Sequence, residues 1–499
     1  MTHFKALKAT VCMAALMSGS AAAADVTASE VWEDWKGLFG IYGEDGVTIG
    51  SETESGGTVS VEDITFSMDD GQSKVTATMD SLELVEQGDG TVLITMSETF
   101  PITVNDEFGS NMDMSVTHSG LSMVASGEPE AINYAITADR YGFQIDSIEE
   151  NGSVVDGDMR FIANGLVGNY TTTSGDIRNI VYDLTTTSMD VLVDVTDPDT
   201  AGTFLLSGKI DGLGATANVA IPEDANFEEP EDLFAKGFAV SGSYSFNSSS
   251  YLFDINDSGE AANGTVGTGT GAVAFDMNGS DLAYDVAAND VAVSITSQEF
   301  PFPINVSLAQ YGVGLQMPLS ATDEPADFGL QFNLTDLAVN DEIWMLGDPT
   351  NALPHDPATL SFDVTGTAKL FFDLMDPEQA EAMAMTDVPG EIYSLDLNDL
   401  KLAIAGALLT GQGGFTFDNS DLSTIPGVPR PEGSVTANLK GANKLIDTLV
   451  SMGYLPEDQA MMGRMMMGMF ARTVGDDELT STLEVNEQGH VLANGQRVR

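Results

Sequence analysis

Three kinds of residue in this 499-residue chain have side chains suited to chemistry, and the histidines come first. Three of the four histidines lie beyond residue 24, namely His118, His355 and His490. His118 precedes Ser119, but neighbours in a strand point to opposite faces, so this pair is no nucleophile and base. His355 stands between a proline and an aspartate, which favours a loop. The motifs of serine hydrolases, zinc proteases and nucleotide-binding loops do not occur, so we expect no catalytic residues and no enzyme.

Methionines near the C-terminus are the second kind, because thioethers are soft ligands that bind Cu(I) in an oxidising compartment. Six apolar residues repeat there at helical spacing: Met461, Met462, Met465, Met466, Met469 and Phe470. The same spacing describes the apolar side of a helix, and methionine fills irregular gaps and adaptable binding surfaces. We therefore expect this stripe to pack in a core or to cap an apolar groove, with copper binding as the alternative.

Residues with oxygen-containing side chains are the third kind, because their oxygens can bind Ca²⁺. One segment of the chain has the spacing of a Ca²⁺-binding loop. Its first candidate ligands are Asp254, Asn256 and Ser258, but position twelve is Thr265 where such a loop needs glutamate. The alternation before it favours a turn between strands. A run of glycine and threonine at 264–271 leads into no helix that could receive a phosphate. The sequence thus predicts no metal site and no cofactor.

The charge of the chain excludes several partners. It has 18 basic residues against 77 acidic ones, a formal net charge of −59. A surface this acidic repels the phosphates of nucleic acids, so we expect no nucleic-acid partner. It also repels anionic lipid head groups.

Residues 1–24 are typical of a secretory signal. Lys5 and Lys8 precede a short apolar run at 11–17, and alanines lead to a predicted cleavage between Ala24 and Asp25. Removing this leader raises the net charge to −61 and takes away the single cysteine, Cys12. We expect an exported, periplasmic protein whose mature chain has no disulfide and no transmembrane helix.

The dominant pattern beyond the leader is strict alternation of apolar and polar residues, the mark of half-buried antiparallel strands. Clear examples are the runs at 92–96, 189–195, 251–255, 311–317 and 328–334. Turn residues such as Asp89-Gly90 separate the runs. The alternation also shifts phase inside strands, at steps such as Glu62-Asp63, Asn164-Gly165 and Thr335-Asp336. Such a shift is typical of a β-bulge, which bends a strand, although some steps could be ordinary turns.

Helical patterns are few and short. Thr27 and Glu30 form a capping box ahead of apolar residues at helical spacing. Asp376-Pro377 opens a second helix, and two more are predicted around 445–450 and from 455 to 470. The sequence predicts a mainly β fold. It consists of a large twisted antiparallel sheet, curled or groove-forming, with a few short helices at the N-terminus and the C-terminus.

We expect four segments along the chain: the signal at 1–24, an N-terminal β half with its leading helix at 25–230, and a second β half at 231–440. A C-terminal helix pair with a closing hairpin follows at 441–499. The two halves could also be one continuous domain. An open sheet rarely exceeds about 10 strands without curling or splitting, and so few helices cannot cover it. Its apolar face must therefore close on itself or remain open as a groove.

Several longer motifs resemble a known family. They are Glu299-Phe300-Pro301-Phe302-Pro303, Gln316-Met317-Pro318-Leu319, Ile343-Trp344, the segment 353–360, the segment 369–377 and the closing segment 486–496. Together they resemble exported alphaproteobacterial proteins of the domain of unknown function 2125 family. The resemblance implies an envelope protein without an assigned activity. The terminal helices and hairpin are also similar to the ends of AsmA-type envelope proteins, which are associated with lipid handling, by analogy of architecture only.

We expect a non-enzymatic envelope protein that binds a lipid or another apolar ligand in a concave groove. The alternative is a structural or interaction protein with a closed core. A hydrolase and an outer-membrane barrel are further alternatives, although the chain lacks hydrolase motifs and ends without an aromatic residue.

Overall fold

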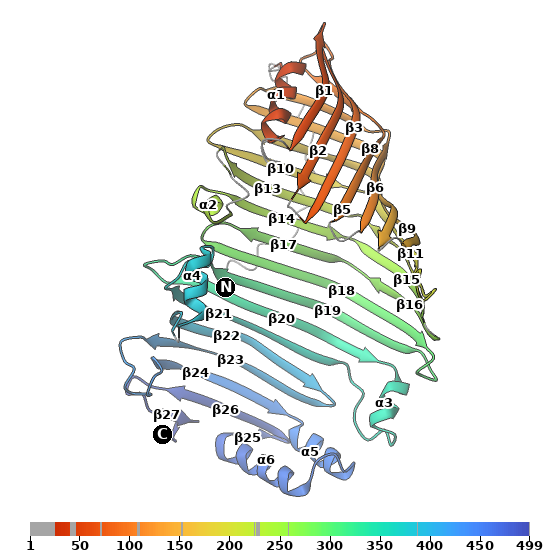
Figure 1. Ribbon diagram of the computed structural model, residues 1–499. Helices are drawn as coiled ribbons and strands as arrows, with labels where there is room; N and C mark the ends of the chain where they lie inside the picture. The colour runs from red at the N-terminus through yellow and green to blue at the C-terminus, as the bar shows by residue number, and fades with distance from the viewer. Residues whose placement is uncertain are drawn as a thin grey trace.

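The computed structural model of the protein describes residues 25–39, 46–69, 72–106, 110–150, 153–223, 225, 230–257, 259–386 and 388–498. The predicted signal, Met1–Ala24, lies outside the described residues, and Asp25 is the first described residue. The described strands form one 28-stranded sheet in which every pairing is antiparallel, and short helices lie near both chain ends, which confirms the predicted fold class (Figure 1).

The sheet begins with nine strands that surround the N-terminal core. They are β1 (Val47–Ser55), β2 (Thr58–Asp69), β3 (Ser73–Glu86), β4 (Val92–Met96), β5 (Thr99–Asp106), β6 (Asn111–Ser119), β7 (Ser122–Glu128), β8 (Ala131–Glu150) and β9 (Ser153–Thr173). Between the long strands β3 and β8 the sheet divides into two columns, β4–β7 and β5–β6.

The sheet divides again beyond β9, into a second pair of columns. The strands are β10 (Ile177–Thr185), β11 (Ser188–Thr196), β12 (Thr203–Asp211), β13 (Gly214–Pro222), β14 (Ala239–Phe246), β15 (Ser248–Asp257), β16 (Glu260–Thr268) and β17 (Gly271–Met277). One column runs β10–β13–β14–β17 and the other β11–β12–β15–β16. In Figure 1 they lie on the left and the right of the sheet. β13 pairs with β14 across the predicted boundary between the halves; the division itself stays a prediction.

The remaining strands continue as a single ladder. They are β18 (Asp281–Ser297), β19 (Ile304–Pro318), β20 (Ala326–Val339), β21 (Ala358–Leu370), β22 (Gly390–Ile404), β23 (Ala407–Asp418), β24 (Arg430–Lys440), β25 (Arg472–Gly475), β26 (Glu478–Val485), β27 (Val491–Ala493) and β28 (Gln496–Arg497). β18 pairs with the last strand of each column and so rejoins them. The predicted final hairpin is β26 and β27, which confirms that element.

A line of irregular positions crosses the sheet and bends it. Residues with positive φ mark it on successive strands or on the links between columns: Asp63, Gly120, Gly165, Gly212, Asp290 and Asp336. A Cβ on Gly120 would lie against Asp139, and Asp139 lies opposite Gly165, because Ala138 and Arg140 pair with Leu166 and Asn164. These irregular positions are therefore adjacent across strands. The register shifts between Leu334 and Leu337, which confirms the bulge predicted at Asp336. At Asp63 and Gly165 the paired strands keep their register, so the predicted change of phase occurs there without a bulge. A further step of this sequence type, Ser280-Asp281, lies at the turn from β17 to β18 and is not a bulge.

Six helices are present among the described residues: α1 (Ala28–Leu38), α2 (Pro230–Ala235), α3 (Asp341–Gly347), α4 (Pro377–Ala384), α5 (Ala442–Ser451) and α6 (Glu457–Phe470). The predicted capping box is present, because Glu30 N–H donates to Thr27 Oγ1 and Thr27 N–H to Glu30 Oε2. Asp376 caps α4 as expected. The short helices α2 and α3 were not predicted, since neither has an apolar repeat long enough to reveal it.

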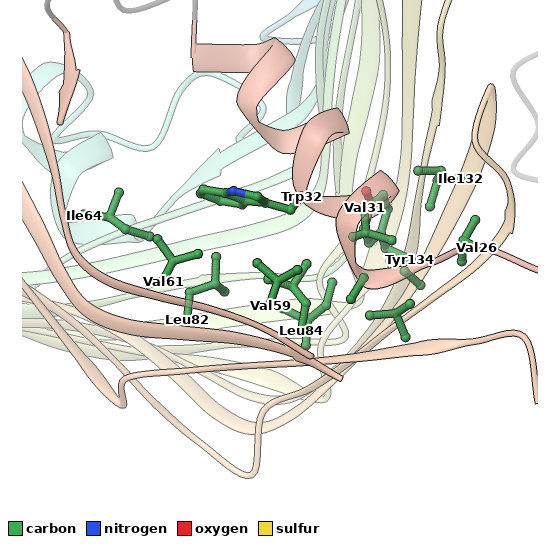
Figure 2. Packing of buried hydrophobic residues seen from close by; sticks show 14 residues of the cluster. Val26, Val31, Trp32, Val59, Val61, Ile64, Leu82, Leu84, Ile132 and Tyr134 are labelled. Carbon is green, nitrogen blue, oxygen red and sulfur yellow. The ribbon is translucent and has the colours of Figure 1, made fainter. Parts of the chain in front are cut away.

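The densest core lies at one end of the sheet, beneath α1 (Figure 2). Val31 and Trp32 of α1 are fully buried against apolar residues of β2, β3 and β8. Val61 and Ile64 flank Asp63, whose positive φ shifts the alternation, and both lie in this core. The shift therefore keeps the apolar side chains on the same face of the sheet.

Candidate apolar binding face

One face of the sheet is apolar along its length. The apolar residues of each strand pair with apolar residues of the next strand, so they lie on the same face. Tyr284 of β18 pairs with Leu315, Leu315 with Leu330, Leu330 with Val364, and Val364 with Leu397 of β22. The side of the sheet that bears α1 is called the apolar face. It consists of these paired residues and of every residue whose side chain points to the same side. The opposite phase is polar and acidic.

The apolar face remains open to solvent beyond the α1 core. Eight of its large side chains are between 37% and 52% exposed: Tyr141, Tyr244, Ile255, Tyr284, Leu330, Leu360, Leu402 and Leu483. Successive pairings from β8 to β26 make thirteen steps. At a strand spacing of about 4.8 Å the face is roughly 60 Å long. Exposed apolar surface of this extent is typical of faces that bind a partner or a ligand, so this face is the candidate site.

A hollow of about 940 Å³ lies along this sheet, where β12, β15, β16, β18, β19 and β20 each contribute to its wall. Its wall follows one registered row that consists of Gly208, Tyr251, Val266, Val293, Val306 and Val339. Gly208 leaves room for the neighbouring ring, since a Cβ at this position would lie 2.2 Å from Tyr251 Cδ1. The volume falls within the range of about 300–1,000 Å³ that is usual for small-molecule sites.

A stack of tyrosines joins the closed end of the apolar face to its open part. The ring centroids of Tyr134 and Tyr170 are 4.8 Å apart, and those of Tyr170 and Tyr182 are 5.7 Å apart. Tyr134 is fully buried under α1. Burial, followed by the nearby carboxylate of Asp34, raises the pKa of Tyr134 far above its usual value. The hydroxyl is therefore neutral and donates a hydrogen bond to Asp34 Oδ2 at 2.9 Å.

Asp34 and Arg178 fix α1 over this closed end. Arg178 Nη1 lies 2.5 Å from Asp34 Oδ1, and the Asp34 side chain is only 3% exposed. The same Arg178 nitrogen donates to Thr172 Oγ1 at 3.2 Å. Sequence reasoning missed this group, because its members are far apart in the chain; a lone aspartate on the apolar side of the leading helix was the only available signal.

The methionine stripe lies on α6, at the other end of the sheet from α1 (Figure 1). Its methionines are between 54% and 71% exposed and Phe470 is 37% exposed: Met461, Met462, Met465, Met466, Met469 and Phe470. None of the six is buried. Ala460 is the buried residue of this helix.

The helix pair is attached to the end of the sheet by polar contacts. Asp477, in the turn before β26, accepts hydrogen bonds from the N–H groups of Asn443 and Lys444 and so caps α5 from outside the helix. Arg464 of α6 pairs with Asp447 of α5. These contacts hold α6 in place while its methionines face outward.

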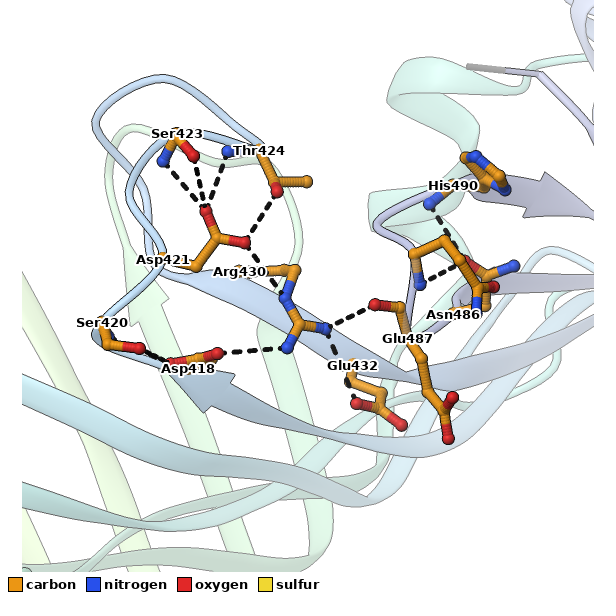
Figure 3. A network of polar contacts seen from close by, with 11 residues as sticks. Asp418, Ser420, Asp421, Ser423, Thr424, Arg430, Glu432, Asn486, Glu487 and His490 are labelled. Carbon is orange, nitrogen blue, oxygen red and sulfur yellow. Dashed lines mark hydrogen bonds and ion pairs between the residues drawn. The ribbon is translucent and has the colours of Figure 1, made fainter.

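A second polar network closes the C-terminal end and is structural (Figure 3). Arg430 of β24 contacts Asp418 at 3.1 Å and Asp421 at 3.3 Å, and it donates to the carbonyl oxygen of Glu487 at 3.0 Å. Hydrogen bonds from Thr424 and Ser423 hold the pKa of Asp421 well below its usual range. The network joins the loop after β23 to the last hairpin.

The remaining sequence candidates do not assemble into a reactive site. His118 Nε2 lies 2.9 Å from the carbonyl oxygen of Ser97, and His355 stacks on Trp344 at 4.4 Å between ring centroids in the loop after α3. Asp254 and Asn256 lie in the hairpin of β15 and β16. Over the part of the chain that the structure describes, no three His, Cys, Asp or Glu side chains are grouped to hold a metal.

Comparison with known proteins places the chain in a wider context. The model of a family described as uncharacterized proteins conserved in bacteria, DUF2125, matches residues 191–495, more than half of the chain. No curated protein and no solved structure matches significantly. Among the described helices, none has the length and apolar character needed to cross a membrane.

Proposed function

We propose that this chain, which belongs to the DUF2125 family of uncharacterized bacterial proteins, binds an acyl-chain lipid along its apolar face and has no enzymatic activity. The proposal also includes export to the periplasm. The leader pattern of residues 1–24 supports export.

The observation that carries the proposal is the open apolar face. Monomeric proteins rarely expose contiguous apolar surface on this scale unless it binds something. The registered valines of β16, β18, β19 and β20 form a continuous apolar row along the hollow. An extended hydrocarbon chain fits a row of this kind, because it needs long apolar contact and few polar partners.

The polar surroundings favour a lipid with little negative charge. The chain carries a net charge of −59, and the opposite face of β21 and β22 presents Asp363, Asp396 and Asp399. An anionic head group would be repelled at low ionic strength. The expected ligand is therefore an acyl chain with a neutral or zwitterionic head group.

Binding of a fluorescent monoacylglycerol to the purified protein tests the proposal. Val364→Asn places an amide on the apolar face and should weaken binding about tenfold, because the hydrocarbon chain cannot satisfy a buried amide. Thr365→Asn is the matched control, since it changes a side chain of similar shape at the next residue, which faces the other way. Val293→Asn should resemble Val364→Asn.

Native mass spectrometry of protein purified from its own envelope gives an independent test. A co-purifying lipid that is lost from Val364→Asn supports the proposal. A wild-type protein that carries no lipid and does not bind the probe would instead indicate a structural or interaction role.

A further inference from the structure

The exposed side of α6 belongs to a larger apolar surface at the end of the sheet. Tyr454, just before α6, is 61% exposed and its hydroxyl donates to the carbonyl oxygen of Gly347 at 2.5 Å. This contact brings the exposed Met345 and Leu346 of α3 next to the helix pair. We call these residues together the methionine surface: Met345, Leu346, Tyr454, Met461, Met462, Met465, Met466, Met469 and Phe470.

The charges around the methionine surface select an electrically neutral occupant. From residue 459 to residue 470 the helix has no carboxylate, and its cation, Arg464, is paired with Asp447. Glu457 and Asp458 stand at its N-terminal end. The net charge of −59 on the whole chain provides no attraction to an anionic surface. A polycationic partner would meet no carboxylate of α6 between residues 459 and 470.

The side chains themselves suit a fluid apolar phase. Methionine is unbranched and adapts its shape, which matters for contact with disordered acyl chains more than for a rigid protein pocket. Tyr454 stands before the stripe and Phe470 at its close. Tyrosine is enriched at membrane–water interfaces, and phenylalanine is common on the apolar side of interfacial helices. A 14-residue helix is about 21 Å long, enough to lie in an interface and too short to span a bilayer.

We propose that the methionine surface docks on a bilayer of neutral, zwitterionic lipid and so brings the end of the apolar face remote from α1 to the membrane. The inference rests on the proposed function, because docking serves a face that receives lipid. The geometry supports this direction, since Trp32 and its neighbours fill the other end of the sheet.

Flotation of the full chain with phosphatidylcholine vesicles tests the proposal. The wild-type protein should float with the vesicles. The triple substitution Met462→Gln, Met465→Gln and Met466→Gln should lower its partitioning about tenfold or more, because it removes apolar side chains from the interface. Adding phosphatidylglycerol to the vesicles should weaken binding of the wild type, and salt should partly restore it.

Met385→Gln is the matched control, because Met385 is 84% exposed but lies after α4, outside the methionine surface. It should float like the wild type. Retained binding of the monoacylglycerol probe from solution shows that the triple variant is folded and keeps its apolar face.

Three results would overturn the inference. The wild type could bind the probe without floating with the vesicles, or the triple substitution could leave flotation unchanged. Thirdly, the wild type could be an oligomer that the triple substitution converts to a monomer. The last would make the methionine surface an interface between copies of the chain. Failure of the wild type to bind the probe would count against the proposed function itself, so the two failures are distinguishable.

Discussion

Arg178 of β10 and Asp34 of α1 are separated by 144 residues in the chain, yet their side chains form a short ion pair of 2.5 Å. The Asp34 side chain is 3% exposed and the Arg178 side chain is 19% exposed. A carboxylate this buried is tolerated only because a cation and the Tyr134 hydroxyl contact it. The pair therefore fastens the helix that closes one end of the apolar face.

Breaking this pair should destabilise the protein strongly. We expect Arg178→Met to lower the free energy of unfolding by about 3–5 kcal/mol, because it leaves a buried carboxylate without its cation. Urea denaturation followed by tryptophan fluorescence measures this, since Trp32 and Trp35 lie in α1. Arg160→Met removes an equal charge from an exposed pair with Asp158 and should cost less than about 1 kcal/mol. Equal losses in the two variants would contradict the assignment.

The bend in the sheet should depend on residues that accept positive φ. Gly165 has φ +62°, and a Cβ there would lie 2.6 Å from Thr187 Oγ1. Gly165→Ala should lower the free energy of unfolding by about 1–3 kcal/mol through backbone strain and this contact. In Gly267→Ala, where the nearest atom would be 3.9 Å away, no such loss is expected. Thermal unfolding of both variants checks the difference, and a stable Gly165→Ala protein would refute it.

Asp348 should make stability depend on pH at the acidic end. Hydrogen bonds from the N–H groups of Ala352 and Leu353 hold the pKa of its carboxyl below the usual value. Because the carboxyl has a lower pKa in the folded protein than in the unfolded chain, it stabilises the fold at pH values above its unfolded pKa of about 3.9. This stabilisation is lost as the pH falls through the pKa of the folded state.

The wild type should therefore be more stable than Asp348→Asn at pH 7, with a gap that narrows below about pH 4. Urea midpoints at several pH values measure the gap. Asp254→Asn, an exposed change on β15, controls for the loss of one negative charge. A gap that is constant or grows toward low pH would show that the carboxylate is not stabilised in the fold.

Oxidation should distinguish the methionines of α6 from those near the core. Met461 and Met465 are 71% and 63% exposed, whereas Met79 and Met123 pack against the α1 core. Dilute hydrogen peroxide should convert the first two to sulfoxide well before the last two, because reaction requires access to the sulfur. Peptide mass spectrometry over time records the order. Equal oxidation rates for the α6 methionines and for Met79 and Met123 would mean that the methionine side of α6 is covered in solution.

The sequence predicted the fold class and most strands because alternation with period two is a local signal that survives without neighbours. It predicted α1 and α4 because their caps are also local, at Thr27 and Asp376. It predicted the bulge at Asp336, since an extra residue shifts the alternation wherever it occurs. It did not predict α3, whose seven residues are too few to show a helical repeat.

The pattern of residues along the chain was enough to predict a long sheet with one apolar phase, an acidic opposite phase and a methionine-rich helix near its end. The folded arrangement revealed that the irregular positions form one line across the strands and that Arg178 pairs with Asp34. It also decided that the apolar face stays open while the α6 methionines point outward. Pattern along a chain reveals which side chains share a face. Whether that face is covered depends on which distant segments pack against it, and that is a property of the folded arrangement alone.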